Sequence, residues 1–198
     1  MTESLQTPRV KLRNFIIIFA VAIALAFLIN ALLGPRPLLT IALEGKPVAE
    51  QIGWGITLAL AVGIPVWIAI LFFPIFTSLK NQFTKLISRV DISGLNPLWI
   101  AVLAGSGEEI LFRGAVQPIT GLWWSSLIFV MLHFRTYQFR SMNRQKAIFI
   151  VAVFLTSLFL GYIFSKIGLI AAIVAHTTLD VVGLFIAQRL VRGYVACA

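Results

Sequence analysis

The chain has 198 residues, of which 60% are hydrophobic and only 12% are charged, and its formal net charge is +9. Soluble domains carry about a quarter charged residues, so this composition excludes a soluble globular protein, a disordered chain and a disulfide scaffold. It indicates an integral membrane protein. The single cysteine, Cys197, permits no intrachain disulfide.

Six apolar segments are predicted to span the membrane. A membrane helix needs about 20 residues, and only the fourth segment is clearly shorter than this. In chain order the segments are 14–33, 52–76, 97–117, 121–134, 147–164 and 168–190. The first follows a basic tail, but its length and the lack of an A-x-A site favour an uncleaved span over a signal peptide.

We therefore expect an all-α, polytopic transmembrane helical bundle that forms one membrane domain over residues 1–198. Its first part, 14–95, holds two spans and a cytoplasmic loop, and its second part, 97–190, holds the remaining four. The charged stretch 77–94 between the two parts is predicted to be a helix on the membrane surface.

Most of the 16 lysines and arginines lie on one side of the membrane if the six helices alternate. They occupy the first tail, the loops after the second and fourth spans, and the C-terminal end. Because positively charged loops stay in the cytoplasm, both termini are predicted to be cytoplasmic. Contact with anionic membrane lipid then explains the positive charge, and nucleic acid is not expected as a partner.

Several ionisable residues fall inside the predicted spans. Three of the seven acidic residues are among them, Glu108, Glu109 and Asp180, as are both histidines, His133 and His176. A charged group at the bilayer centre costs at least about 2.5–3.5 kcal/mol, so such residues are functional hypotheses by default.

The spacing of these residues separates structural from chemical roles. Glu109 and Arg113 are four residues apart and are predicted to pair, which favours a structural role. Glu108 points about 100° away from Glu109 and has no obvious partner on its own helix. His176 and Asp180 share one helix face. A glutamate near a histidine and a water has the parts of a general base, whereas an interhelical hydrogen bond remains the alternative for each histidine.

Three motifs in this half of the chain resemble those of one protein family. Residues 108–113 resemble an EExxxR motif, Phe129 to His133 resemble FxxxH, and His176 to Asp180 resemble HxxxN/D. These motifs, in this order, are similar to those of the CPBP family. Its members are the CAAX-protease and bacteriocin-processing membrane proteins, also called Abi proteins or type II CAAX prenyl endopeptidases. The resemblance covers roughly 97–190 as a four-helix catalytic core.

The resemblance implies an intramembrane endopeptidase that hydrolyses membrane-associated proteins or peptides, prenylated ones included. It implies that Glu108 activates water together with His133, and that His176 and Asp180 bind a metal or stabilise the oxyanion. The supporting residues that it implies are Glu109, Arg113 and Phe129.

The cofactor is left open by this resemblance. The four residues Glu108, His133, His176 and Asp180 could supply nitrogen and oxygen ligands to a divalent metal such as zinc, but no HExxH is present. The alternative is glutamate-activated water without metal.

One position departs from the pattern of the prenyl-protein proteases, which often have Asn where this chain has Asp180. An ionised aspartate cannot donate to an oxyanion as an amide can, so Asp180 must be protonated, orient His176 or bind metal. The chain's own Cys197 is too near the end to form a CAAX box.

Two non-proteolytic readings stay open. One is a non-catalytic membrane protein of the same fold, such as a bacteriocin-immunity or assembly factor. The other is a proton or ion carrier, which would use the same buried acids but for which no inverted repeat is visible.

Overall fold

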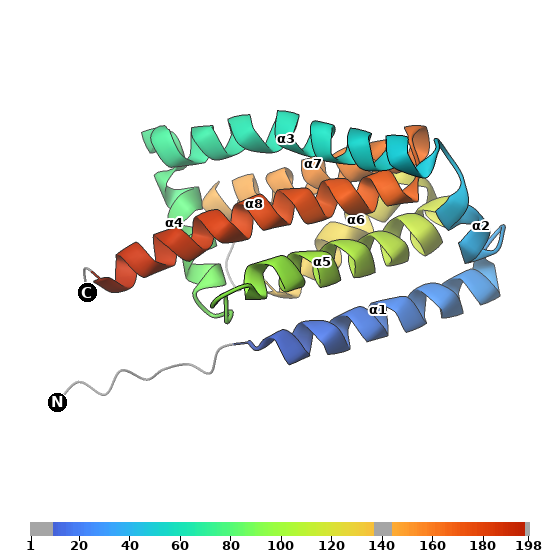
Figure 1. Cartoon of the computed structure of the whole chain (residues 1–198), viewed down its shortest axis with the longest axis horizontal. Helices are drawn as coiled ribbons and strands as arrows, with labels where there is room; N and C mark the ends of the chain where they lie inside the picture. The colour runs from blue at the N-terminus through green and yellow to red at the C-terminus, as the bar shows by residue number, and fades with distance from the viewer. Residues whose placement is uncertain (1–9, 137–143, 197–198) are drawn as a thin grey trace.

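The computed structural model describes residues 10–136 and 144–196, and within these residues it contains helices and no strand. In chain order the elements are α1 (Leu12–Leu33), α2 (Leu38–Leu43), α3 (Val48–Phe72), the 3-10 turn η1 (Pro74–Phe76), α4 (Thr77–Ile87), α5 (Asn96–Glu109), the π-helix η2 (Ile110–Val116), α6 (Gln117–Thr136), α7 (Arg144–Lys166) and α8 (Leu169–Ala196). The long helices lie side by side (Figure 1). The predicted all-α polytopic bundle is confirmed.

Two of the six predicted spans share one apolar run. Within the described residues, 5 helices are long and apolar enough to cross a membrane. The predicted third and fourth spans lie in one apolar run of 38 residues, Asn96–His133. This run bends at Gly121, whose φ of 80° and ψ of 171° are not helical. Among the described residues there are therefore five long apolar helices, and one of them contains the predicted third and fourth spans as two arms that meet at Gly121.

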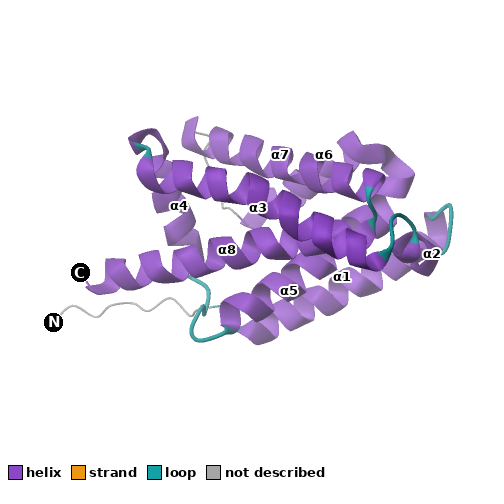
Figure 2. Ribbon diagram, turned by 45° about the horizontal axis from the view of Figure 1, so that its top comes forward, coloured by secondary structure: helices purple, strands orange, loops and turns teal. Residues whose placement is uncertain are grey.

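Helix α8 is the centre of the bundle and packs against α3, α4, α5 and α7 (Figures 1 and 2). It can approach them closely because its inward residues are small: Ala171, Ala172, Ala175 and Ala187 are fully buried. In lipid, helix association is not driven by the hydrophobic effect, and small residues at the contacts let the backbones pack closely instead. The large apolar side chains of α1 and α3 are mostly exposed, as expected of surfaces that face lipid.

Helix α4 crosses the end of the bundle at which α3 ends and α5 begins (Figure 1). The predicted helix in the 77–94 segment is therefore present, although it ends at Ile87. Lys85 on this helix and Arg89 just after it are exposed, whereas Leu79 and Phe83 are partly buried. Three residues on which the predicted charge distribution and chain end depend, Arg9, Arg140 and Cys197, lie outside the described residues.

The bend at Gly121 generates a prediction about stability. A Cβ at Gly121 would meet no atom within 4 Å, but its φ is +80°. This backbone region is essentially restricted to glycine and costs about 1–3 kcal/mol for other residues. We expect Gly121→Ala to lower the free energy of unfolding by that amount, measured by denaturant titration in one fixed detergent.

Gly53 provides the matched control. It also has open space for a Cβ, but it lies inside α3, where alanine is favoured over glycine by about 0.5–1 kcal/mol. Gly53→Ala should therefore raise the stability. Equal effects of the two substitutions would contradict a backbone cause at Gly121.

Candidate active site

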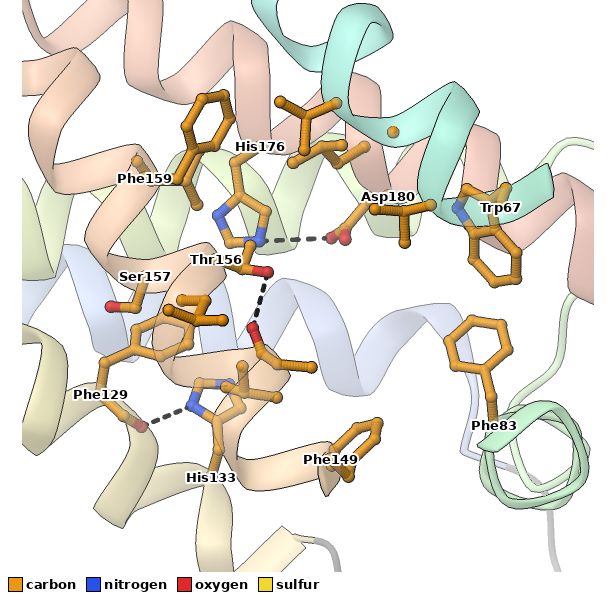
Figure 3. A pocket seen from close by; sticks show the side chains of 18 of the residues that line it. Trp67, Phe83, Phe129, His133, Phe149, Thr156, Ser157, Phe159, His176 and Asp180 are labelled. Carbon is orange, nitrogen blue, oxygen red and sulfur yellow. Dashed lines mark hydrogen bonds and ion pairs between the residues drawn. The ribbon is translucent and has the colours of Figure 1, made fainter. Parts of the chain in front are cut away.

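A cavity of about 640 Å³ lies between α3, α4, α7 and α8, and its lining is largely apolar. Four ionisable side chains interrupt that lining: Glu108 from α5, His133 from α6, and His176 and Asp180 from α8. Figure 3 shows the histidines and Asp180 pointing into the same space. The structure thus brings together all four residues that the sequence analysis assigned to chemistry, while their roles stay predictions.

A close approach of two helices brings Glu108 to α8. A Cβ on Gly105 would lie 2.9 Å from the backbone nitrogen of Thr177, so only glycine lets α5 lie this near to α8. Thr177 directly follows His176, and Glu108 lies about one turn beyond Gly105. The two motifs therefore meet where the two backbones are closest.

The bend at Gly121 explains how His133 reaches Glu108. The sequence places His133 at the inner end of its span, whereas it places Glu108 about 18 Å from the inner end of its own span. In the predicted arrangement the two residues would therefore lie at different depths in the membrane. In the structure, Glu108 and His133 stand at nearly equal distances along the chain before and after Gly121. Because the chain turns back there, and because α6 ends soon after His133, the two side chains lie at the same depth.

Glu108 is the common neighbour of both imidazoles. Its Oε1 lies 3.5 Å from Nε2 of His133, and its Oε2 lies 3.9 Å from Nε2 of His176. The same Nε2 of His176 lies 3.7 Å from Oδ2 of Asp180. These separations are longer than the usual direct hydrogen bond.

The second nitrogen of each ring has its own partner. Nδ1 of His133 lies 2.8 Å from the carbonyl oxygen of Phe129, and the Phe129 ring stacks on the imidazole at 4.2 Å. Nδ1 of His176 lies 2.8 Å from Oε1 of Glu109. A carbonyl or a carboxylate can only accept, so both rings carry the proton on Nδ1 and direct Nε2 toward Glu108.

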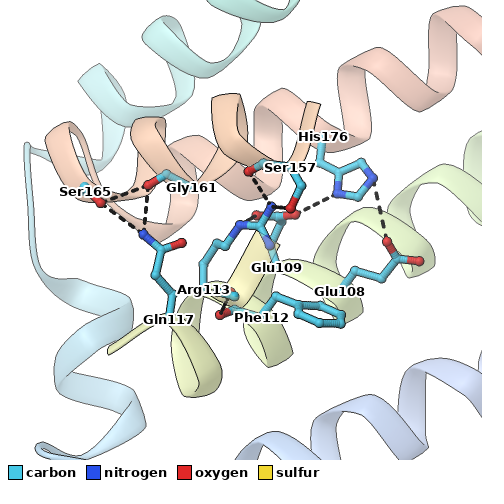
Figure 4. A network of polar contacts seen from close by, with 10 residues as sticks. Glu108, Glu109, Phe112, Arg113, Gln117, Ser157, Gly161, Ser165 and His176 are labelled. Atoms are coloured by element: carbon cyan, nitrogen blue, oxygen red, sulfur yellow. Dashed lines mark hydrogen bonds and ion pairs between the residues drawn. The ribbon is translucent and has the colours of Figure 1, made fainter. Parts of the chain in front are cut away.

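Glu109 and Arg113 form a fully buried ion pair, with 3.1 Å between Oε2 and Nε. Nη2 of Arg113 donates to the carbonyl oxygen and to the hydroxyl of Ser157 on α7, at 2.9 and 3.1 Å. The guanidinium also lies 5.4 Å from the ring centroid of Phe129. Figure 4 shows the resulting chain of contacts from Ser157 through Arg113 and Glu109 to His176. The pair that the spacing predicts therefore ties α7 to the imidazole of α8.

Two polar residues of this network were missed by the sequence analysis. Ser157 accepts from Arg113, and Gln117 donates to the carbonyl oxygen of Gly161 and to the hydroxyl of Ser165, both at 3.0 Å. Their signal was a matching four-residue spacing on two helices, 113 and 117 opposite 157 and 161. Neutral polar residues in membrane helices are too common for this spacing to have stood out.

The donor set suits a divalent metal in its chemistry, because two imidazole nitrogens and two carboxylates are typical zinc ligands. Nevertheless, among the described residues, no group of three or more His, Cys, Asp or Glu side chains is gathered in the way a metal ion requires. The side chains are thus arranged around Glu108 rather than around one position that a metal ion could occupy.

The fold and the cavity define an integral membrane protein with a carboxylate–histidine site inside its helices. Residues 93–182 match the family model described as type II CAAX prenyl endopeptidase Rce1-like. This segment contains Glu108, Glu109, Arg113, His133, His176 and Asp180. This segment of the chain is therefore similar to the Rce1-like family, which is a family of proteases.

A curated relative gives a similar extent. The uncharacterized protein YpbD of Bacillus subtilis (strain 168) is 33% identical over 99 residues, which are 50% of this chain and 48% of that protein. The match thus spans about half the length of either chain. No solved structure matches the chain.

The buried ion pair generates a prediction about stability. Arg113→Leu would leave the Glu109 carboxylate buried without its cation, and breaking a buried pair in this way typically costs about 3–5 kcal/mol. Ser157→Ala should cost about 1 kcal/mol, because the backbone oxygen still accepts from Arg113. Both are measured as the loss in free energy of unfolding in detergent.

Arg36 supplies the control, because it pairs with Glu44 at an exposed position. Exposed pairs contribute about 0–1 kcal/mol, so Arg36→Leu should change little. If Arg113→Leu were as mild as Arg36→Leu, the buried pair would not hold the bundle together.

Proposed function

We propose that the protein is an intramembrane endopeptidase that hydrolyses membrane-associated protein substrates with a glutamate-activated water. One observation carries the proposal: the Glu108 carboxylate faces two imidazole Nε2 atoms, at 3.5 and 3.9 Å, within a largely apolar cavity. A carboxylate placed beside two imidazoles is suited to act as a general base.

In the proposed reaction, a water bound between Glu108 and His133 loses a proton to Glu108 while its oxygen attacks the peptide carbonyl carbon. The new C–O bond moves the carbonyl electrons onto oxygen. When the tetrahedral intermediate collapses, the C–N bond breaks, and Glu108 returns the proton to the leaving amine. His133, whose Nδ1 proton is held by the carbonyl of Phe129, presents Nε2 to accept from the same water.

His176 and Asp180 are proposed to stabilise the oxyanion. Glu109 accepts from Nδ1 of His176, so a second proton on this ring would lie on Nε2, where the N–H can donate to a developing negative charge. Asp180, 3.7 Å from the same Nε2, orients the ring. This assignment needs no hydrogen bond from an ionised aspartate to the oxyanion.

Lipid-attached substrates fit the cavity. Its lining is mainly apolar, and three of the lining residues, Val62, Val66 and Leu155, are 42%, 48% and 58% exposed on faces that meet lipid. A hydrocarbon chain can therefore pass from the bilayer into the cavity without crossing a polar surface. The name of the matching family adds a prenylated, C-terminal cysteine segment as the first substrate to test.

The decisive substitution is Glu108→Gln, which keeps the size of the side chain but removes the base. We expect it to lower kcat for prenylated and unprenylated fluorogenic peptides by about 100-fold or more, with unchanged yield and elution in detergent. Glu50→Gln is the control, because Glu50 is an exposed glutamate that pairs with Lys46 on the bundle surface.

Normal cleavage by Glu108→Gln would show that the base is assigned wrongly. If the Glu108, His133 and His176 variants could replace the wild-type protein in cells that lack it, a non-catalytic immunity or assembly factor would be favoured. Loss of wild-type cleavage with a chelator, restored by zinc, would replace unassisted water activation with a metal-dependent reaction.

We also propose that both termini face the cytoplasm. The start of α1, helix α4 and the end of α8 lie at the same end of the bundle (Figure 1), and this end carries Lys85 and Arg89 at exposed positions. Excess positive charge marks the cytoplasmic side.

Cysteine labelling tests this orientation. In a Cys197→Ser background, Lys85→Cys should react with an impermeant maleimide only in inside-out vesicles, and Lys46→Cys, at the opposite end, only in right-side-out vesicles. The reverse pattern would invert the topology.

A further inference from the structure

The wall of the cavity has two origins. The ionisable residues lie in the segment that matches the family model, residues 93–182. The facing wall comes from α3 and α4, which lie outside that segment and contribute only apolar residues and one glycine: Val62, Gly63, Val66, Trp67, Ile70, Leu79 and Phe83. The ionisable residues therefore come from one part of the chain, whereas the apolar wall is shared between that part and the two helices outside it.

Trp67 and Phe83 are the largest side chains of this facing wall, and they contact each other. Their ring centroids are 5.1 Å apart and their planes make an angle of 64°, an edge-to-face arrangement that aromatic pairs favour. In Figure 3 they lie beyond Asp180, on the side of the cavity away from Phe129 and Phe159. The pair joins α3 to α4 on that side of the cavity.

Helix α8 holds the Trp67 ring in place. A Cβ on Gly183 would lie 3.0 Å from Cζ2 of Trp67, so the indole lies against the backbone of α8 where a side chain would crowd it. Gly183 is three residues after Asp180, which corresponds to about 4.5 Å along a helix. The indole therefore stands within about one helical turn of Asp180 and about two turns of His176.

We propose that Trp67 and Phe83 determine specificity by forming an end wall that limits the length of the apolar group carried next to the scissile bond. This inference rests on the proposed peptidase function. A group bound with its peptide carbonyl near Glu108 and His176 reaches the indole about two turns further along α8, because Gly183 lies seven residues after His176. Further methylenes then have no space unless the wall moves. Well-packed protein interiors do not yield to such additions without strain.

The test uses peptides whose cysteine carries straight S-alkyl chains of increasing length. While the chain is shorter than the cavity, each added methylene should raise kcat/KM by about four-fold, the equivalent of about 0.8 kcal/mol of buried CH₂. At the wall, the increase should stop. Trp67→Ala should move this limit to longer chains by several methylenes, and Phe83→Ala should move it in the same direction.

Trp54→Ala is the matched control, because Trp54 is on the same helix, is 47% exposed and does not line the cavity. It should leave the length limit unchanged. If Trp67→Ala proves too unstable to purify, Trp67→Phe and Phe83→Leu make smaller reductions of the same wall and should give a smaller shift.

The two proposals can fail separately. Binding of the same peptides to Glu108→Gln, followed by fluorescence anisotropy in nanodiscs, should show the same length limit without any cleavage. If wild type cleaves nothing but binding shows a limit that moves in Trp67→Ala, the peptidase proposal fails and the wall stands. If the limit is the same in wild type and Trp67→Ala, or if wild type shows no limit across the series, the wall proposal is wrong.

Discussion

The buried ion pair between Glu109 and Arg113 is the interaction on which the site depends. A carboxylate inside a membrane protein is tolerated only when its charge is matched, and here the two oxygens of Glu109 face in different directions, Oε2 to Arg113 and Oε1 to His176. The carboxylate whose charge Arg113 neutralises therefore also holds the Nδ1 proton and the ring of His176 in place. Arg113 extends this arrangement to α7 through Ser157. Stability and ring orientation thus share one set of atoms.

Features that depend on the period of a single helix could be predicted from the sequence. The apolar runs mark the helices by their length, and the four-residue spacings of Glu109 with Arg113 and of His176 with Asp180 place each pair on one face whatever the surrounding fold. The gathering of Glu108, His133, His176 and Asp180 was expected from the family resemblance, because no pattern within one helix states how helices far apart in the chain are arranged.

Contacts between helices could not be derived in this way. The hydrogen bond of Glu109 with His176 and the contact of Trp67 with Phe83 depend on how closely helices approach, which is decided by glycines such as Gly105 and Gly183 that carry no chemical signal. Hydropathy separated the arms 97–117 and 121–134, but it could not show that they form one apolar run whose direction changes at Gly121.

The π-helix Ile110–Val116 directly follows Glu109, and its winding decides how the chain after it is oriented. A π turn holds one more residue between hydrogen-bonded partners than an α turn does. If the same residues were wound as a regular α-helix, each would turn by about 100°, and everything after Val116 would be rotated relative to Glu109. Gln117 would then turn away from α7, and the arm that carries His133 would leave from another face. In this segment the winding of the backbone therefore constrains the site as strongly as the identity of its side chains.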